Sequence, residues 1–244
     1  MRGVNDDAEF DHGLPTVLAA LDDVRAPALR EHVEIISKGL GERFLHETFV
    51  ACFSTSRTIE SQWVDYADSQ RGFVVTLDNL VISALDAPNG MRLLPVEYDA
   101  MIQRARARRV VALAVDDLSA VTEAPGSLGF VWAVQSRFTL LAAELYFQCA
   151  SFKAEKWRRE LEWRLVYSRQ ATESGALPIR VNESRGRMVR HVDIDLRRRF
   201  AQHHRPTFTS VCAGPKTPRD TLELTRDYLR SHEPGVTWEQ QLPF

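Results

Sequence analysis

Apolar residues recur first at helical and then at strand-like spacing over the first hundred positions. Residues 14–46 predict a helix, because apolar side chains return about every 3.6 residues, at Leu29, Val33, Ile36 and Leu40. A short helix is predicted over 58–67. Apolar runs predict three strands, at 47–54, 71–77 and 92–98. The third contains Pro95, which cannot donate a backbone hydrogen bond, so we expect it at a sheet edge.

The middle of the chain predicts two long helices, over 100–121 and 127–152. The turn sequence TEAPGS separates them. The second contains the stretch FVWAVQSRFTLLAAELYF, which is apolar on nearly every side. A helix of this kind is either buried on most sides or faces a partner. Residues 127–150 are accordingly a candidate surface for self-association.

Strand-like alternation returns in the last third of the chain. It predicts strands over 160–168, in parts of 187–196 and over 207–213, followed by a final helix over 218–231. Strands before and after a helical middle indicate an α+β fold. We expect one domain, 1–244, with a mixed or antiparallel central sheet, a long and largely apolar helical pair inserted in the middle, and a C-terminal helix.

The composition limits the classes of function. Among 244 residues, 33 acids stand against 31 Lys and Arg, a net charge of −2, which argues against a nucleic-acid coat or a polybasic membrane binder. No apolar run reaches the ~20 residues of a membrane span. Three scattered cysteines form neither a disulfide framework nor a zinc site, and no phosphate-binding or serine-hydrolase motif is present. We expect a cytoplasmic protein with no membrane partner, no indicated nucleic-acid partner, no metal site and no evident cofactor.

The segment 153–168 (KAEKWRRELEWRLVYS) carries the densest polar chemistry of the chain. If a strand begins at Glu160, the side chains of Glu160, Glu162 and Arg164 share one face, because successive strand residues point to opposite faces. The other face is then apolar and belongs in the core: Leu161, Trp163 and Leu165. Two acids and a base are thus expected on one side of a single strand.

Two carboxylates two residues apart on a strand lie roughly 7 Å from each other. They repel unless a cation lies between them, and one of the two carboxyls can have a raised pKa. The nearest basic candidates are Arg158, Arg159 and Arg164. In a functional interpretation, Glu162 stabilises a cationic centre or positions a sugar hydroxyl, as paired acids do in glycosyl transfer. In the structural alternative, these residues form a surface salt-bridge ladder beside a buried Trp.

A second segment, 49–78, supplies aromatic and hydroxyl groups. Trp63 and Tyr66 are three residues apart and share a face of the short predicted helix. They either form an aromatic platform at the mouth of a ligand cleft or pack the helix onto the sheet. Ser54 either contacts a phosphate at the N-terminus of that helix or serves as an ordinary cap.

Five motifs in the chain follow the order typical of one bacterial family. They are a Phe-Ser strand, a Trp-x-x-Tyr-Ala helix, a Gly-led strand, a Lys…Glu-x-Glu-Trp-Arg block and a Gly-Pro turn before the last helix, within 50–78, 153–168 and 210–244. The chain thus resembles the family named domain of unknown function 2971. Members begin with an aromatic-rich strand ahead of an Asn-Asp-Pro motif, to which residues 4–10 (VNDDAEF) correspond. The resemblance implies that the N-terminal edge strand of the family is missing here.

The layout of that family is similar to the layout of ADP-ribosyltransferase folds. This similarity implies that Glu162 is the catalytic acid at the nicotinamide ribose and that Glu160 assists attack by the acceptor. It also implies an NAD cleft lined by Trp63 and Tyr66, with Ser54 near the ribose. NAD is implied as a ligand by this analogy alone.

Three functions are compatible with the sequence. The first is a module that binds a small anionic or nucleotide-like ligand without catalysis, in a pocket of Trp63, Tyr66, Glu162 and Arg164. The second is an ADP-ribosylating enzyme that uses Glu162. The third is a structural or interaction protein that docks a partner through 127–150. We favour the nucleotide-type site, with possible glycosyl transfer, because core packing does not require two acids and an arginine on one face.

Overall fold

The computed structural model describes residues 7–25, 29–42, 47–78, 91–122, 126–169, 177–184, 187–194 and 208–241. Its helices are α1 (Asp7–Asp22), α2 (Arg30–Glu42), α3 (Glu60–Tyr66), α5 (Ala100–Ser119), α6 (Leu128–Ser151), the 3-10 helix η2 (Glu155–Glu160) and α8 (Arg219–His232). Its strands are β1 (Glu47–Ser54), β2 (Phe73–Leu77), β3 (Met91–Pro95), β4 (Glu162–Arg169), β5 (Ile179–Ser184), β6 (Arg187–Val192), β7 (Phe208–Ala213) and β8 (Thr237–Gln240). The fold is therefore α+β.

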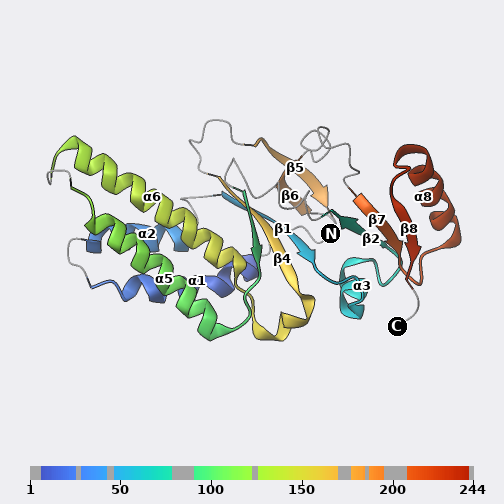
Figure 1. Cartoon of the computed structure of the whole chain (residues 1–244), viewed down its shortest axis with the longest axis horizontal. Coiled ribbons are helices and arrows are strands. Elements are labelled where there is room, and N and C mark those ends of the chain that lie inside the picture. The colour runs from blue at the N-terminus through green and yellow to red at the C-terminus, as the bar shows by residue number, and fades with distance from the viewer. Residues whose placement is uncertain are drawn as a thin grey trace.

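Helices α1, α2, α5 and α6 form a bundle at one end of the molecule (Figure 1). Their shared core includes Val17, Leu21, Leu40, Val111, Leu145 and Cys149. Helix α1 approaches α6 very closely at Gly13, where an added Cβ would lie 2.6 Å from the Cys149 carbonyl oxygen. The two long helices of the middle are confirmed, whereas the single helix predicted over 14–46 is wrong. The chain makes α1 and α2 instead, and the sequence between them contains Pro27, which disfavours a continuous helix.

Helix α6 is buried along only part of its length. Its second half contributes Leu145, Tyr146 and Phe147 to the interior. Its first half exposes the apolar side chains of Leu128, Val131 and Trp132 to solvent, and Leu140, just past the midpoint, is exposed as well. The prediction of a helix buried on most sides therefore holds for the C-terminal half alone.

Strand β4 is the centre of an antiparallel sheet with the order β1-β4-β3. One face packs on α6 through Val166, which joins Phe147 and Ala150 in a small cluster. The other face carries Leu165 and Tyr167 and is covered by apolar side chains from 177–194, where the β5–β6 hairpin lies. Strand β3, which ends at Pro95, lies at the sheet edge as predicted.

The predicted apolar face of β4 is only partly correct. Leu165 is buried, but Leu161 is 48% exposed and Trp163 is 37% exposed. Strand β4 begins two residues later than expected, after a left-handed residue, Leu161, with φ +48°, so Leu161 lies outside the strand. Trp163 is the second residue of the strand, and the apolar side chains from 177–194 pack with Leu165 and Tyr167 further along it.

A second sheet, with the order β2-β7-β8, lies at the other end of the molecule. It is mixed, because β7 and β8 run parallel. Helix α3 covers one face, where Trp63 packs against Cys212 and Val74. Helix α8 lies against the opposite face, next to β8 (Figure 1). No helix in the described part of the chain is long and apolar enough to cross a membrane.

Candidate functional site

Four buried charged side chains meet where the helical bundle joins the first sheet. Lys153 Nζ lies 2.6 Å from Glu160 Oε2 and 2.9 Å from Glu162 Oε2. Arg164 holds the same Glu162 carboxylate with Nε at 2.8 Å from Oε1 and Nη2 at 3.3 Å from Oε2. We call Lys153, Glu160, Glu162 and Arg164 the charge quartet. Its two acids and two bases balance, and each of the four residues is less than a tenth exposed.

The backbone brings the quartet together from three consecutive elements. Lys153 follows the last residues of α6, Glu160 ends η2, and Glu162 opens β4. A residue in the left-handed conformation, Leu161, lies between the two acids, and both carboxylates reach the same ammonium group. The cation between the acids is thus Lys153, and not one of the arginines expected from the sequence.

Arg164 links the sheet to the end of α6. Its Nη1 donates to the Ala150 carbonyl oxygen at 2.6 Å, in the last turn of the helix. Carbonyl groups in a last helical turn have no partner within the helix, and a cation there also favours the helix dipole. Arg164 is 1% exposed, so a single guanidinium both caps α6 and neutralises Glu162.

Neutral groups surround the charge quartet and fix its position. The Tyr98 hydroxyl accepts the backbone N–H of Glu162 at 3.1 Å. The carbonyl of Glu160 accepts hydrogen bonds from Ser54 Oγ at 2.8 Å and from Gln62 Nε2 at 3.0 Å. Gln103 donates to the carbonyl of Lys153 at 2.9 Å. Contacts from β1 and α3 thus converge on the turn between the two acids, and α5 holds the carbonyl of Lys153.

Burial is the largest single influence on the Glu162 carboxyl, and it opposes ionisation. The hydrogen bonds and charge of Arg164 outweigh it, with hydrogen bonds from Cys52 and Lys153, so the pKa of Glu162 lies below its ordinary value of 4.5. Because cations lie beside it, Glu162 is not a carboxyl with a raised pKa. Burial also raises the pKa of Tyr98 above 10.0, against the smaller effect of its hydrogen bond to the Glu162 backbone.

The two aromatic residues of the predicted cleft differ in burial. Trp63 is 1% exposed, and its indole donates to the Arg57 carbonyl oxygen at 2.6 Å, so it packs α3 onto the second sheet. Tyr66, on the same short helix, is half exposed. The member of α3 that contacts the turn of the acids is Gln62. The aromatic platform of the ligand hypothesis is therefore not formed by Trp63, which has the packing role of the alternative.

Ser54 lies beside the turn between the two acids, and its hydroxyl is used locally. It donates to the Glu160 carbonyl and accepts the backbone N–H of Ser56 at 3.2 Å. These bonds tie the end of β1 to the turn before β4. Helix α3 begins at Glu60, after Ile59, with no side-chain cap, so Ser54 does not cap that helix, and its contact with a phosphate stays a prediction.

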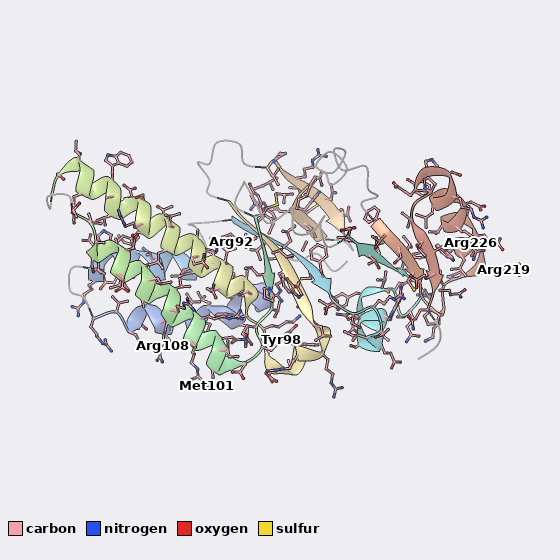
Figure 2. All side chains as sticks on the ribbon, in the orientation of Figure 1. Arg92, Tyr98, Met101, Arg108, Arg219 and Arg226 are labelled. Atoms are coloured by element: carbon pink, nitrogen blue, oxygen red, sulfur yellow. The ribbon has the colours of Figure 1, made fainter. Side chains whose placement is uncertain are left out.

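Two further members of the site, Lys153 and Tyr98, were missed by sequence reasoning. Lys153 opens the segment 153–168 as its first residue, and its position seven and nine residues before the two acids was the available signal. Tyr98 lies in a loop before α5, near the junction of bundle and sheet (Figure 2). Its pairing with Glu162 across 64 residues left no local pattern.

The geometry limits the chemistry that Glu162 can perform. Both of its carboxylate oxygens are held by cations, and its side chain is 5% exposed. A catalytic acid or nucleophile must reach its substrate within hydrogen-bond distance. A substrate would therefore have to displace Lys153 or Arg164 first. A cavity of the described structure lies elsewhere, between α8 and β8.

Within the described ranges, no three His, Cys, Asp or Glu side chains come together as metal ligands do. No family model, curated protein or solved structure matches this chain. The resemblance to the domain of unknown function 2971 family therefore stays a prediction from the motifs. NAD as a ligand stays a prediction from the analogy with ADP-ribosyltransferase folds.

Proposed function

We propose that this protein is a non-catalytic binding module in which the charge quartet is structural. The observation that carries the proposal is the saturation of Glu162 by Lys153 and Arg164 at 5% side-chain exposure. A neutral, buried network of this kind joins α6 to β4 and fixes their relative position. Removing one partner from this network would destabilise the fold, because it would leave an uncompensated buried charge.

The proposal is tested by measuring NAD consumption with wild type and with Glu162→Gln. We expect no consumption above the buffer rate for either protein, together with a lower melting temperature for the variant. Glu155→Gln is the matched control, because Glu155 is a nearby acid whose side chain is 63% exposed. Turnover by wild type that is lost in a normally stable Glu162→Gln protein would instead establish the glycosyl-transfer function.

A second candidate function is self-association through the first half of α6. Leu128, Val131 and Trp132 are all at least half exposed there, although exposed apolar groups cost free energy in water. A second copy of the chain would cover these side chains. The expected measurement is a dimer in light scattering of the wild type and a monomer for Trp132→Glu. Leu224→Glu, on the exposed side of α8, is the matched control, and a monomeric wild type would refute this candidate.

A further inference from the structure

A small cavity lies between α8 and the strand that follows it, at the end of the molecule opposite the helical bundle. Its volume is about 330 Å³. The apolar part of its wall is made by Leu229, Pro234, Val236 and Trp238, and two guanidinium groups, of Arg226 and Arg230, border it. Figure 2 places Arg226 on α8, far from Tyr98, whose hydroxyl contacts the backbone of Glu162.

The indole of Trp238 is held in place from two directions. Its ring centroid lies 6.1 Å from that of Phe73 on β2. The Arg226 guanidinium carbon lies 5.5 Å from the indole on the cavity side, which is within the range of cation–π contacts. This contact orients the guanidinium while leaving its N–H donors available, because cation–π attraction uses the face of the group and not its edge.

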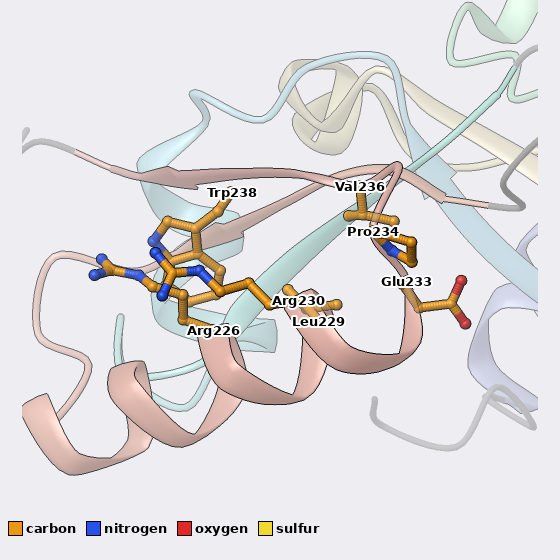
Figure 3. A pocket seen from close by; sticks show the side chains of 7 residues that line it. All are labelled: Arg226, Leu229, Arg230, Glu233, Pro234, Val236 and Trp238. Carbon is orange, nitrogen blue, oxygen red and sulfur yellow. The ribbon is translucent and has the colours of Figure 1, made fainter.

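Acids of the same region leave the two arginines largely uncompensated. Within the described part of the chain, Arg226 has no ion pair, and Arg230 reaches only Asp227, at 4.0 Å. Glu239, next to Trp238 along β8, points to the opposite sheet face and pairs with Arg57 at 2.5 Å. Glu233 also borders the cavity, but its carboxylate points away from both guanidiniums (Figure 3).

Two guanidiniums beside an indole and an aliphatic wall match a ligand with two parts. Guanidinium forks fit phosphate oxygens in a bidentate manner, and the aromatic and aliphatic wall suits a flat apolar body. The volume is near the lower end of the range for small-molecule sites, about 300–1,000 Å³. It therefore suits one mononucleotide and not a dinucleotide such as NAD.

We propose that the cavity of Arg226, Arg230 and Trp238 binds a phosphate monoester carried on an aromatic body, the chemistry of a nucleoside monophosphate. The two arginines bind the phosphate, and Trp238, Leu229 and Val236 contact the base. This gives the proposed binding role a ligand class and places its site on α8 and β8. The residues differ from those of the charge quartet.

The test is isothermal titration calorimetry of the full chain with AMP, adenosine and inorganic phosphate. We expect saturable AMP binding at one site per chain, with adenosine and phosphate each binding at least about tenfold more weakly. Arg226→Gln and Arg230→Gln should each weaken AMP binding by about tenfold or more, since each removes charge-assisted hydrogen bonds. Arg219→Gln is the matched control, because Arg219 lies on the same helix, is 92% exposed and pairs with Glu223.

Three results would overturn the inference: no AMP binding by the wild type, an equal loss in the Arg219→Gln control, or phosphate binding as tight as AMP binding. The melting temperature of each variant, measured in parallel, shows that the comparison is made on folded protein. The NAD assay with Glu162→Gln uses other residues and another ligand. A failure of AMP binding therefore leaves the structural role of the charge quartet to its own test.

Discussion

Replacing Arg164 with methionine removes the guanidinium that neutralises Glu162 and caps α6. Methionine is similar in length and has no charge, so the change leaves the Glu162 carboxylate with Lys153 as its one cation, shared with Glu160. It also leaves the Ala150 carbonyl without its 2.6 Å hydrogen bond. Breaking a buried ion pair from one side costs about 3–5 kcal/mol. Against a total stability of about 5–15 kcal/mol, that loss is large.

Urea unfolding at neutral pH, followed by circular dichroism, measures this loss as a change in midpoint and slope. Arg158→Met is the matched control, since Arg158 makes an ion pair with Glu155 at 2.6 Å while both side chains are more than half exposed. Exposed pairs contribute little, so the control should lose far less stability than Arg164→Met.

The double variant Glu162→Met/Arg164→Met separates charge imbalance from loss of packing. It removes one acid and one base together and leaves Lys153 balanced by Glu160. We expect it to be more stable than Arg164→Met alone, because no uncompensated charge remains. An Arg164→Met protein that is as stable as the Arg158→Met control, or a double variant less stable than Arg164→Met, would refute the argument for a structural quartet.

Three further measurements test other parts of the structure. Gly13→Ala should lower the free energy of unfolding by about 1–3 kcal/mol through overpacking against the Cys149 carbonyl, although Ala is the better helix former. An unchanged or raised stability in urea would contradict the close approach of α1 and α6. Tyr98 should ionise above pH 10.0 in a difference titration of phenolate absorbance against Tyr98→Phe, because burial raises its pKa. The stability that this shift contributes is present below pH 10.0 and is lost as the pH rises through the folded pKa. Ionisation at or below pH 10.0 would contradict its burial. Thiol labelling of the native protein should modify Cys52 alone, since Cys149 and Cys212 are buried, whereas labelling in urea should modify all three cysteines. Rapid reaction of more than one thiol in the native protein would contradict the burial of Cys149 and Cys212.

The sequence predicted the long helices well because their patterns are local and long. The expected bounds 100–121 and 127–152 differ by only one or two residues from α5 and α6. Short strands carry a weaker signal, so β5 and β8, with exposed and polar residues, were missed. The first helix was predicted wrongly for another reason: the helical periodicity of 14–46 gave no sign that this sequence folds as two helices.

The candidate site was predicted in part. A shared location for Glu160, Glu162 and Arg164 followed from strand alternation, although Glu160 reaches the site from η2 and not from the strand. The contributions of Lys153 and Tyr98 depend on the approach of α6 and the loop before α5 to β4, which no local pattern encodes. Burial of Trp63 likewise depends on the second sheet, whose strands β2 and β7 are far apart in the sequence.

The most direct test of the structural role of the charge quartet is a pH titration of the Glu162 carboxyl by ¹³C NMR, assigned with Glu162→Gln. Because Arg164 and Lys153 lower the pKa of Glu162, the stability that this carboxylate contributes is present above pH 4.5 and is lost as the pH falls through the folded value. We expect the carboxyl to remain ionised below pH 4.5 and to become protonated as the native fold is lost. Protonation at or above pH 4.5 in a protein that stays folded would contradict the account.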